Sequence, residues 1–390
     1  MNKPFSFLIL TISIMSVTVG FSQKTNISKV EWKKAAQLQN ADGSLSRGFA
    51  GPINGVDNNV LIVAGGANFL DKMPWEGGKK HYSKEIHVLE KNKEQYDWNK
   101  KSKIELPEPI AYCGNVSTSF GIVYVGGENE NGLSNKAYIL KWNSDKNEVE
   151  IKTLPDFPIK ITNIALVNVK NVVYAIGGDE ATKSSDLVYS IDLNNEKQEW
   201  KSEPKLPFAL ANSVAVVQNE KEDLSIYVVG GRTKTASGIS DLHNTTLAFN
   251  LKKQAWENKA VITDGKKTTN FSAGAGVAFG KHYIIITGGD NGETFHKIET
   301  YLSQIAKTAS EEEKAKLIAE KNILNTTHQG FYNAVLLYDT LKNKWSKIGE
   351  LPFLAHVTTT AVLWNDKIVL SNGEIKPGIR TPNIMLGTIK

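Results

Sequence analysis

Short apolar runs that end in a pair of glycines recur along most of the chain. Each run is rich in Val, Ile and Tyr and has the length of a buried strand. Successive pairs lie about 50 to 60 residues apart, with one longer interval before the last. A sixth, degenerate copy has Asn372 in place of the first glycine. The copies are at 61–66, 123–127, 173–178, 226–231, 284–289 and 368–373. The pattern predicts a chain built from repeated β-rich units.

Each unit repeats more than its glycines. A second β-rich run precedes each pair, a third follows, and a tryptophan closes most units after a turn. The closing tryptophans are Trp98, Trp200, Trp256 and Trp345, with Trp142 arriving slightly early. Four short strands per unit, at a period near fifty, resemble the kelch repeat. We therefore predict an all-β fold, a six-bladed kelch-type β-propeller.

The two ends of the chain complement each other. The last unit stops after its third predicted strand, at 384–390, without a closing tryptophan. Residues 30–38 have the pattern of a fourth strand and contain Trp32. We expect this N-terminal strand to complete the sixth blade and close the ring, which hides the edges that an open ring would expose.

One insertion interrupts the fifth unit. Between about 294 and 325, apolar residues recur at helical spacing among Lys and Glu, which predicts two short helices in the loop after the second strand. A loop this long either covers or binds something, or is a solvated decoration.

The N-terminus has the features of a signal peptide. Lys3 precedes an apolar stretch at 5–20, and Gly20 and Ser22 suit the −3 and −1 positions of a cleavage site. We expect residues 1–22 to be removed and the protein to be exported, to the periplasm, with 23–390 forming one propeller domain without a membrane span. An uncleaved anchor is the alternative, for which the apolar stretch is short.

Composition narrows the choice of partners and cofactors. The net charge is +5 with Lys and Arg dispersed, so we expect no nucleic-acid partner. Cys113 is the only cysteine, so no disulfide can form within the chain, and we expect it in the core. The histidines show no zinc-ligand spacing, and no carboxylate cage of EF-hand type occurs, so no metal and no cofactor are expected.

The candidate chemistry lies in the loops that follow the glycine pairs, which should all open at one mouth of the ring. The first residues of these loops are Ala67, Glu128, Asp179, Arg232, Asp290 and Glu374. The acidic residues could simply be turn formers. The sixth loop goes further, because Glu374 and Arg380 flank a Pro-Gly turn and can meet at one pocket. Arginine can bind a substrate carboxylate in a bidentate manner, and a partly buried glutamate can act as a general base or acid. A structural ion pair is the alternative.

Four motifs make the resemblance specific. They are Gly-Glu-Ile-Lys-Pro-Gly-Ile-Arg-Thr at 373–381, Gly-Phe-Ala-Gly at 48–51, Ala-Gly-Gly-Ala at 64–67, and Gly-Lys-Lys-His-Tyr-Ser at 78–83. With them the mature chain resembles the N-acetylneuraminate epimerase (sialic acid mutarotase) family. The order of the motifs is that of a cyclically permuted branch, in which the Gly-Glu loop ends the chain.

The resemblance implies a function and a site. In the family this glutamate is the proposed proton acceptor and this arginine belongs to the same site, so the roles fall to Glu374 and Arg380. Lys376, Lys80 and Arg232 are weaker candidates for substrate contacts. The implied reaction interconverts the α and β anomers of free N-acetylneuraminate by ring opening and closure, without a cofactor. The alternative is a non-catalytic kelch propeller that binds a glycan or protein, since a fold does not fix a function. A hydrolytic sialidase ranks last, because its repeat motif and arginine set are missing.

Overall fold

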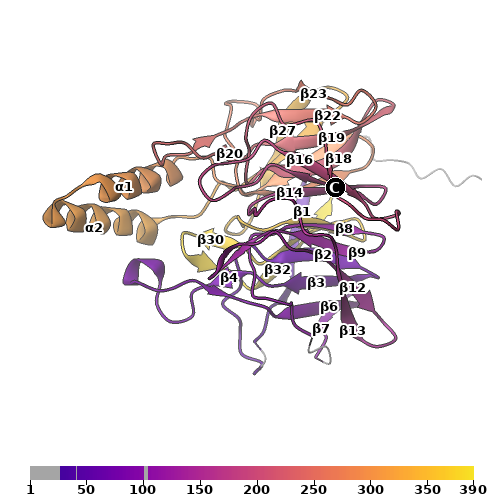
Figure 1. Cartoon of the computed structure of the whole chain (residues 1–390), viewed down its shortest axis with the longest axis horizontal. Helices are drawn as coiled ribbons and strands as arrows, with labels where there is room; N and C mark the ends of the chain where they lie inside the picture. Colours follow the sequence, from indigo (N-terminus) through magenta and orange to yellow (C-terminus); the bar gives the residue numbers. More distant parts are fainter. Residues whose placement is uncertain (1–26, 41, 101–103) are drawn as a thin grey trace, which may run out of the picture.

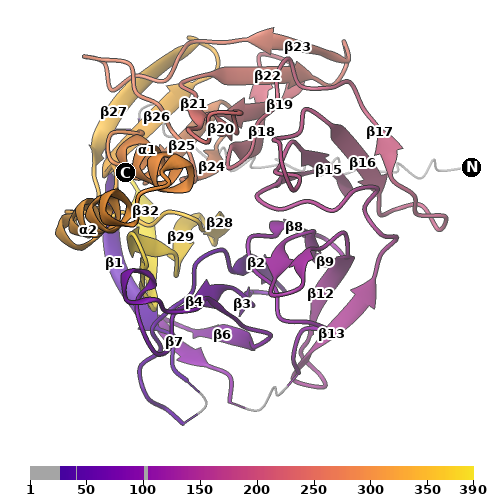
Figure 2. The same cartoon turned by 60° about the vertical axis from the view of Figure 1, so that its left-hand side comes forward.

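Six four-stranded antiparallel sheets surround a central axis in the computed structural model, which describes residues 27–40, 42–100 and 104–390 (Figures 1 and 2). The predicted six-bladed propeller is confirmed. The predicted signal peptide, residues 1–22, lies outside the described residues.

The first three blades follow one another along the chain. Blade 1 consists of β2 (Ile53–Asp57), β3 (Val60–Ala64), β6 (Ile86–Asn92) and β7 (Gln95–Trp98). Blade 2 consists of β8 (Gly114–Thr118), β9 (Gly121–Val125), β12 (Ala137–Asn143) and β13 (Glu148–Thr153). Blade 3 consists of β14 (Ala165–Val169), β15 (Val172–Ile176), β16 (Val188–Asp192) and β17 (Lys201–Ser202).

The last three blades include the insertion and both ends of the described chain. Blade 4 consists of β18 (Val214–Glu220), β19 (Asp223–Val229), β22 (Thr246–Asn250) and β23 (Ala255–Asn258). Blade 5 consists of β24 (Ala275–Phe279), β25 (Tyr283–Thr287), β26 (Ala334–Asp339) and β27 (Lys344–Glu350). Blade 6 consists of β28 (Ala361–Trp364), β29 (Lys367–Ser371), β32 (Asn383–Ile389) and β1 (Val30–Gln37).

The N-terminal strand closes the ring, as predicted. β1 pairs antiparallel with β32, with Trp32 opposite Gly387 (Figure 2). The Trp32 ring packs edge-on against Phe353 at 5.6 Å between ring centroids. Blade 1 then bonds to this strand, because the Trp98 indole donates to the Gln37 carbonyl at 2.8 Å.

The glycine pairs are required where neighbouring blades touch. In five blades the second glycine donates its N–H to a carbonyl of the next blade at 2.7–2.8 Å, as Gly66 does to Ile110. A Cβ on Gly65 would lie only 2.5 Å from that same oxygen, and both glycines have positive φ. Any side chain here would therefore force the blades apart.

The closing tryptophans occupy the outer part of the wedge between blades. Trp98, Trp256 and Trp345 lie on fourth strands, and Trp200 directly precedes one. Trp142 does not fit the scheme, because it lies in β12, the third strand of blade 2, and is buried opposite Val149. Its early position in the sequence thus reflects a different strand, and the fourth strand of that blade has no tryptophan.

A closed ring of backbone hydrogen bonds surrounds the axis on the side of the glycine pairs. One residue from each blade donates its N–H to the carbonyl of the equivalent residue in the preceding blade, at 2.7–3.0 Å. All six have φ between +51° and +60°. The members of this axial ring are Gly51, Tyr112, Asn163, Asn212, Ala273 and Thr358. Positive φ costs a non-glycine residue about 1–3 kcal/mol, so the ring holds strained backbone at the floor of the mouth.

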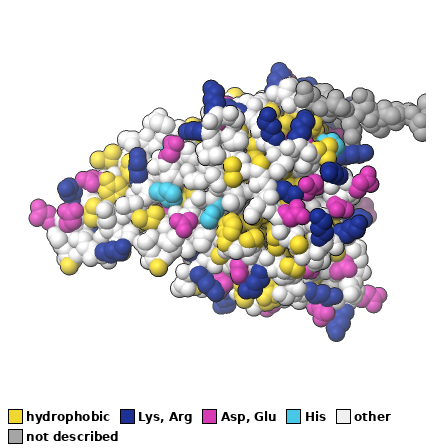
Figure 3. Space-filling view, turned by 90° about the horizontal axis from the view of Figure 1, so that it is seen from above, with side chains coloured by type: hydrophobic (Ala, Val, Ile, Leu, Met, Phe, Trp, Pro, Cys, Tyr) yellow, Lys and Arg dark blue, Asp and Glu magenta, His cyan; other side chains and the backbone are white. Residues whose placement is uncertain are grey.

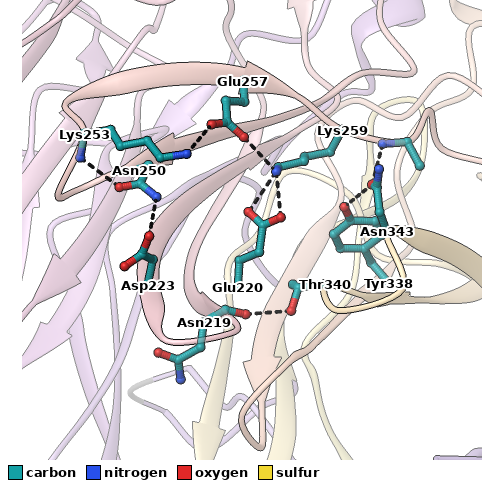
Figure 4. A network of polar contacts seen from close by, with 11 residues as sticks. Asn219, Glu220, Asp223, Asn250, Lys253, Glu257, Lys259, Tyr338, Thr340 and Asn343 are labelled. Carbon is teal, nitrogen blue, oxygen red and sulfur yellow. Dashed lines mark hydrogen bonds and ion pairs between the residues drawn. The ribbon is translucent and has the colours of Figure 1, made fainter.

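Polar contacts hold blades 4 and 5 together at the opposite face (Figure 4). Asn343 of blade 5 accepts the Ala260 N–H of blade 4 at 2.8 Å. Within blade 4, Lys259, with a side chain only 9% exposed, binds Glu220 at 2.7 Å and Glu257 at 2.9 Å. Thr340 of blade 5 donates its hydroxyl to the Asn219 carbonyl at 2.6 Å. Blade-to-blade contact is therefore polar at its rim and apolar between the sheets.

The insertion in blade 5 is a helical hairpin, as predicted, formed by α1 (Phe295–Lys307) and α2 (Glu311–Thr327). It projects from the mouth side as a lobe (Figures 1 and 3) and exposes Leu302, Ile318 and Ile323. Ser310 caps α2 by accepting the Glu313 N–H, and three glutamates complement the helix dipole in its first turn. Neither helix, among the described residues, has the length and hydropathy of a membrane span.

Candidate active site

The mouth loops are anchored to the axial ring by six equivalent bridges. The residue after each glycine pair forms an isolated β-bridge with the residue that precedes the ring member of its own blade, as Glu374 does with Val357. Four of these loops continue as two-stranded hairpins. They are β4 (Ala67–Asn68) with β5 (His81–Tyr82), β10 (Glu128–Asn129) with β11 (Gly132–Leu133), β20 (Arg232–Thr233) with β21 (Asp241–Leu242), and β30 (Glu374–Lys376) with β31 (Ile379–Arg380).

Glu374 and Arg380 face each other, as the sequence predicted. They are register partners in the hairpin of β30 and β31. Glu374 Oε2 lies 3.5 Å from Arg380 Nη2, and Glu374 Oε1 accepts the Gly378 N–H at 2.7 Å. The Pro-Gly turn therefore positions the carboxylate as well as reversing the chain.

Arg380 is buried and incompletely paired. Its side chain is 5% exposed, and its guanidinium lies 4.9 Å above the ring centroid of Phe69. No described residue hydrogen-bonds to its buried Nε and Nη1 atoms. Leaving guanidinium donors buried without an acceptor is costly, and an anionic ligand would remove that cost.

The neighbouring motif 48–51 holds this hairpin in place. Asn372, fully buried with φ +58°, accepts the Phe49 N–H through its side-chain oxygen at 3.2 Å. Gly373 donates to the Phe49 carbonyl at 2.7 Å. A Cβ on Gly48 would clash with the Thr381 carbonyl. Asn372, the asparagine of the degenerate repeat, thus links blades 6 and 1 through a hydrogen bond, two residues before Glu374.

Tyr112 is a site residue that the sequence did not reveal. Blade 1 contributes the small residues Gly51 and Ala67 at the floor of the mouth, and a Cβ on Gly51 would lie 2.5 Å from Tyr112 Cδ1. The tyrosine therefore fills this space. Burial raises the pKa of Tyr112, opposed by the charges of Lys80 and Arg380 and reinforced by those of Glu374 and Glu128. Its hydroxyl stays protonated at neutral pH, close to two ion pairs, Glu374 with Arg380 and Lys80 with Glu128.

Two of the three weaker candidates, Lys80 and Arg232, have protein partners. Lys80 binds Glu128 at 3.1 Å and lies 4.9 Å from the Tyr112 ring centroid. Burial opposes the charge of Lys80, but Tyr112, Glu128 and Tyr82 together raise its pKa. Arg232 donates to Asp179 at 2.6 Å, and Asp179 is fully buried.

The carboxylates predicted at the mouth therefore differ in function. The carboxylate of Asp179 accepts hydrogen bonds from the side chains of Arg232, Asn163 and Ser184. Asp290 is partly buried, and this burial raises its pKa, although the Gly292 N–H and His296 oppose this effect. Glu374 is the one that combines partial exposure, at 16% of its side chain, with a position beside a buried arginine.

A pocket of about 290 Å³ opens between blades 4, 5 and 6 and the helical hairpin. This volume is near the lower end for small-molecule sites, roughly 300 Å³. Three axial-ring residues form its floor: Asn212, Ala273 and Thr358. Glu374 and Arg232 also line it, whereas Lys80, Lys376 and Arg380 do not.

His328, which follows α2, also lines the pocket and was not identified from the sequence. Its Nδ1 accepts the Gly330 N–H at 3.0 Å, so the proton of the neutral ring is on Nε2. Burial lowers the pKa of His328, and the nearby Lys376 ammonium lowers it further. Lys376 thus affects the pocket through this histidine.

The helical hairpin bridges the mouth. On one side, Glu299 of α1 accepts the Ser240 N–H of blade 4 at 2.7 Å, and His296 contacts the Ser240 carbonyl at 2.8 Å. On the other side, Asn322 of α2 donates to the Trp75 carbonyl of blade 1 at 3.4 Å. Trp75 belongs to the short helix η1 (Pro74–Glu76), which packs against Gly378. The insertion and the first mouth loop therefore cover the Glu374 hairpin.

Acid should destabilise blade 6 through His356. This side chain is 2% exposed, and burial lowers its pKa to about 4 from 6.5, against a weaker opposing bond to the Asn372 backbone. The unfolded chain thus binds more protons between these values, so the free energy of unfolding falls as pH drops through this range. The expected loss between pH 7 and pH 5 is about 2 kcal/mol.

Urea unfolding at both pH values tests this expectation. In His356→Gln the overall stability will be lower, but this part of the pH dependence should vanish. An unchanged difference between pH 7 and pH 5 in the variant would assign the acid sensitivity to other groups.

Metal ligands are not assembled in the described part of the chain, where no three His, Cys, Asp or Glu side chains are placed to hold an ion. Cys113 lies just before β8, where its thiol donates to the Gly126 carbonyl at 3.1 Å and burial raises its pKa. It is a core residue, as predicted.

Known proteins are similar to this chain in sequence. A family profile described as N-acetylneuraminate epimerase matches residues 16–151 and 154–390. The N-acetylneuraminate epimerase of Salmonella typhi is 30% identical over 234 residues, which cover 59% of this chain and 56% of that protein. That of Pasteurella multocida (strain Pm70) is 30% identical over 240 residues, covering 60% of this chain and 58% of that protein. The alignments span little more than half the length of these relatives, whereas the profile match covers nearly all of this chain. The chain belongs to the N-acetylneuraminate epimerase family.

Proposed function

We propose that the mouth interconverts the α and β anomers of free N-acetylneuraminate. The observation that carries the proposal is Arg380, a buried guanidinium whose Nε and Nη1 bond to no described residue, 3.5 Å from the carboxylate of Glu374, which lines a sugar-sized pocket. The first group suits the carboxylate of a sugar acid, and the second suits the hydroxyl of the adjacent anomeric carbon.

The reaction needs one proton removed and one delivered. Arg380 binds the C1 carboxylate through Nε and Nη1. Glu374 takes the proton of the anomeric hydroxyl while the bond between the anomeric carbon and the ring oxygen breaks. The ring oxygen receives a proton and the open-chain keto acid forms. Rotation about the bond next to the keto carbon then lets the ring close on the other face, with the proton returned from the ring-oxygen hydroxyl to the anomeric oxygen through Glu374.

Within this proposal Glu374 passes the anomeric proton to the ring oxygen, and a hydrogen bond from His328 stabilises the charge that develops on that oxygen. The Nε2–H of His328 belongs to a neutral ring that lines the same pocket as Glu374. A positioned acid/base group such as Glu374 contributes about 10²- to 10⁴-fold.

A non-catalytic binding function is favoured by one observation. Both oxygens of Glu374 have protein partners, Gly378 and Arg380, so the carboxylate could be purely structural. NMR of α-N-acetylneuraminate, freshly released by a sialidase, separates the two functions. A catalyst accelerates the conversion of α to β at substoichiometric protein, whereas a binder shifts or broadens the sugar signals without changing the rate.

Replacing Arg380 by Lys should weaken substrate binding while leaving the positive charge in place. A lysine cannot offer the planar pair of donors, so we expect KM to rise about 10- to 100-fold with a smaller change in kcat. The same NMR assay at several sugar concentrations gives both constants. Lys146→Met, on the exposed hairpin of blade 2, is the control. A rise in KM of less than twofold in Arg380→Lys would mean that the substrate carboxylate binds to a group other than Arg380.

A further inference from the structure

We infer that the helical hairpin forms a subsite for an N-acyl group of the substrate, with Asn325 as its hydrogen-bonding residue. This inference rests on the proposed function and extends it to substrate selection. It assigns a function to the insertion and names the part of the sugar that the insertion contacts.

The pocket has two chemically different sides. The side nearer the axial ring is polar and includes Glu374, Ser272 and Thr358. The opposite side is apolar and comes largely from the insertion and the segment that leaves it, through Phe295, Ile298 and Phe331. A methyl or short alkyl group would bury apolar area on this second side.

Besides His328, which follows α2, the insertion side contributes one further polar side chain to the pocket, that of Asn325. It lies on α2, is 9% exposed and lines the pocket. Its side-chain amide hydrogen-bonds to none of the described residues, although most buried amides in proteins are paired. An amide bordered by apolar side chains is suited to another amide, because it can both donate to a carbonyl and accept from an N–H.

The geometry of the sugar fits this division. In N-acetylneuraminate the acylamino group is on the ring carbon directly opposite the anomeric carbon. With the anomeric hydroxyl at Glu374, that group points away from the hairpin of β30 and β31. The pocket extends from Glu374 to the side formed by α1 and α2, which matches this direction.

The test compares two sugar acids with the wild-type protein and Asn325→Leu. One sugar is N-acetylneuraminate, and the other has a hydroxyl group in place of the acylamino group. For the wild type we expect the first sugar to bind about 10-fold more tightly or better. In Asn325→Leu its dissociation constant and KM should rise roughly 5- to 50-fold, with those of the second sugar changed less than threefold.

Stability provides an independent readout. Leucine removes an amide that has no protein partner, so the melting temperature should stay the same or rise. Ile323→Ala, on the exposed face of α2 at 60% exposure, is the matched control. It should leave the dissociation constant and KM of both sugars unchanged.

The outcomes separate this inference from the proposed function. If the wild type turns over neither sugar, the proposed function is wrong, and the dissociation constants alone decide the subsite. An Asn325→Leu variant that binds N-acetylneuraminate as the wild type does, or that weakens both sugars by the same factor, overturns the subsite. Failure of the wild type to bind N-acetylneuraminate overturns both.

Discussion

Glu374→Gln is expected to slow anomer interconversion about 10²- to 10⁴-fold, the usual contribution of a positioned acid/base group. Gln keeps an oxygen that can accept the Gly378 N–H, now 2.7 Å from Oε1, so the turn should be retained. It cannot take a proton from the anomeric hydroxyl. Binding of the sugar through Arg380 should persist, so the loss should appear in kcat.

The control for this variant is Glu150→Gln, an exposed carboxylate on β13 of blade 2. It should match the wild type in rate. Circular dichroism melting must show that Glu374→Gln remains folded. A folded Glu374→Gln protein with more than half of the native kcat would assign proton removal to another group.

Removing residues 1–38 is expected to abolish both folding and activity. The deletion removes β1, the buried side chains of Ile27 and Leu38, and the Gln37 carbonyl that binds Trp98 of blade 1. β32 then becomes an unpaired edge just three residues after Arg380. The loss is comparable with the whole stability of a domain, about 5–15 kcal/mol.

Size-exclusion chromatography and the interconversion assay measure the two effects together. We expect aggregated, inactive protein, and partial recovery on addition of a synthetic peptide of residues 27–38, which can add as a strand. Deletion of residues 1–26 alone should leave a folded, active protein. A monomeric, active protein lacking residues 1–38 would contradict the closure by β1.

The fold could be predicted because its cause is local and repeated. Gly65 and its equivalents lie against a carbonyl of the next blade, so the glycine pair recurs in five of the six units. The closure by β1 followed from counting strands at both ends. Trp142 was misplaced because a tryptophan near the end of a unit fits the third strand as well as the fourth.

The site was predictable only within one hairpin. Glu374 and Arg380 are six positions apart across a recognisable turn, so their meeting could be read from the sequence. Tyr112, Asn325 and His328 come from blade 2 and the insertion, and no local pattern marks them. Tyr112 enters the mouth because two small residues of another blade leave it room, and Arg232 acquires Asp179 as a partner across a blade boundary. Such contacts depend on the whole ring.

Exchange NMR of N-acetylneuraminate at anomeric equilibrium tests the central claim most directly. With substoichiometric protein, we predict exchange cross-peaks between the C3 protons of the α and β anomers, at a rate proportional to the protein concentration. These cross-peaks should be lost with Glu374→Gln. Native protein that binds the sugar but produces no exchange above that of buffer would contradict the claim that this mouth is catalytic.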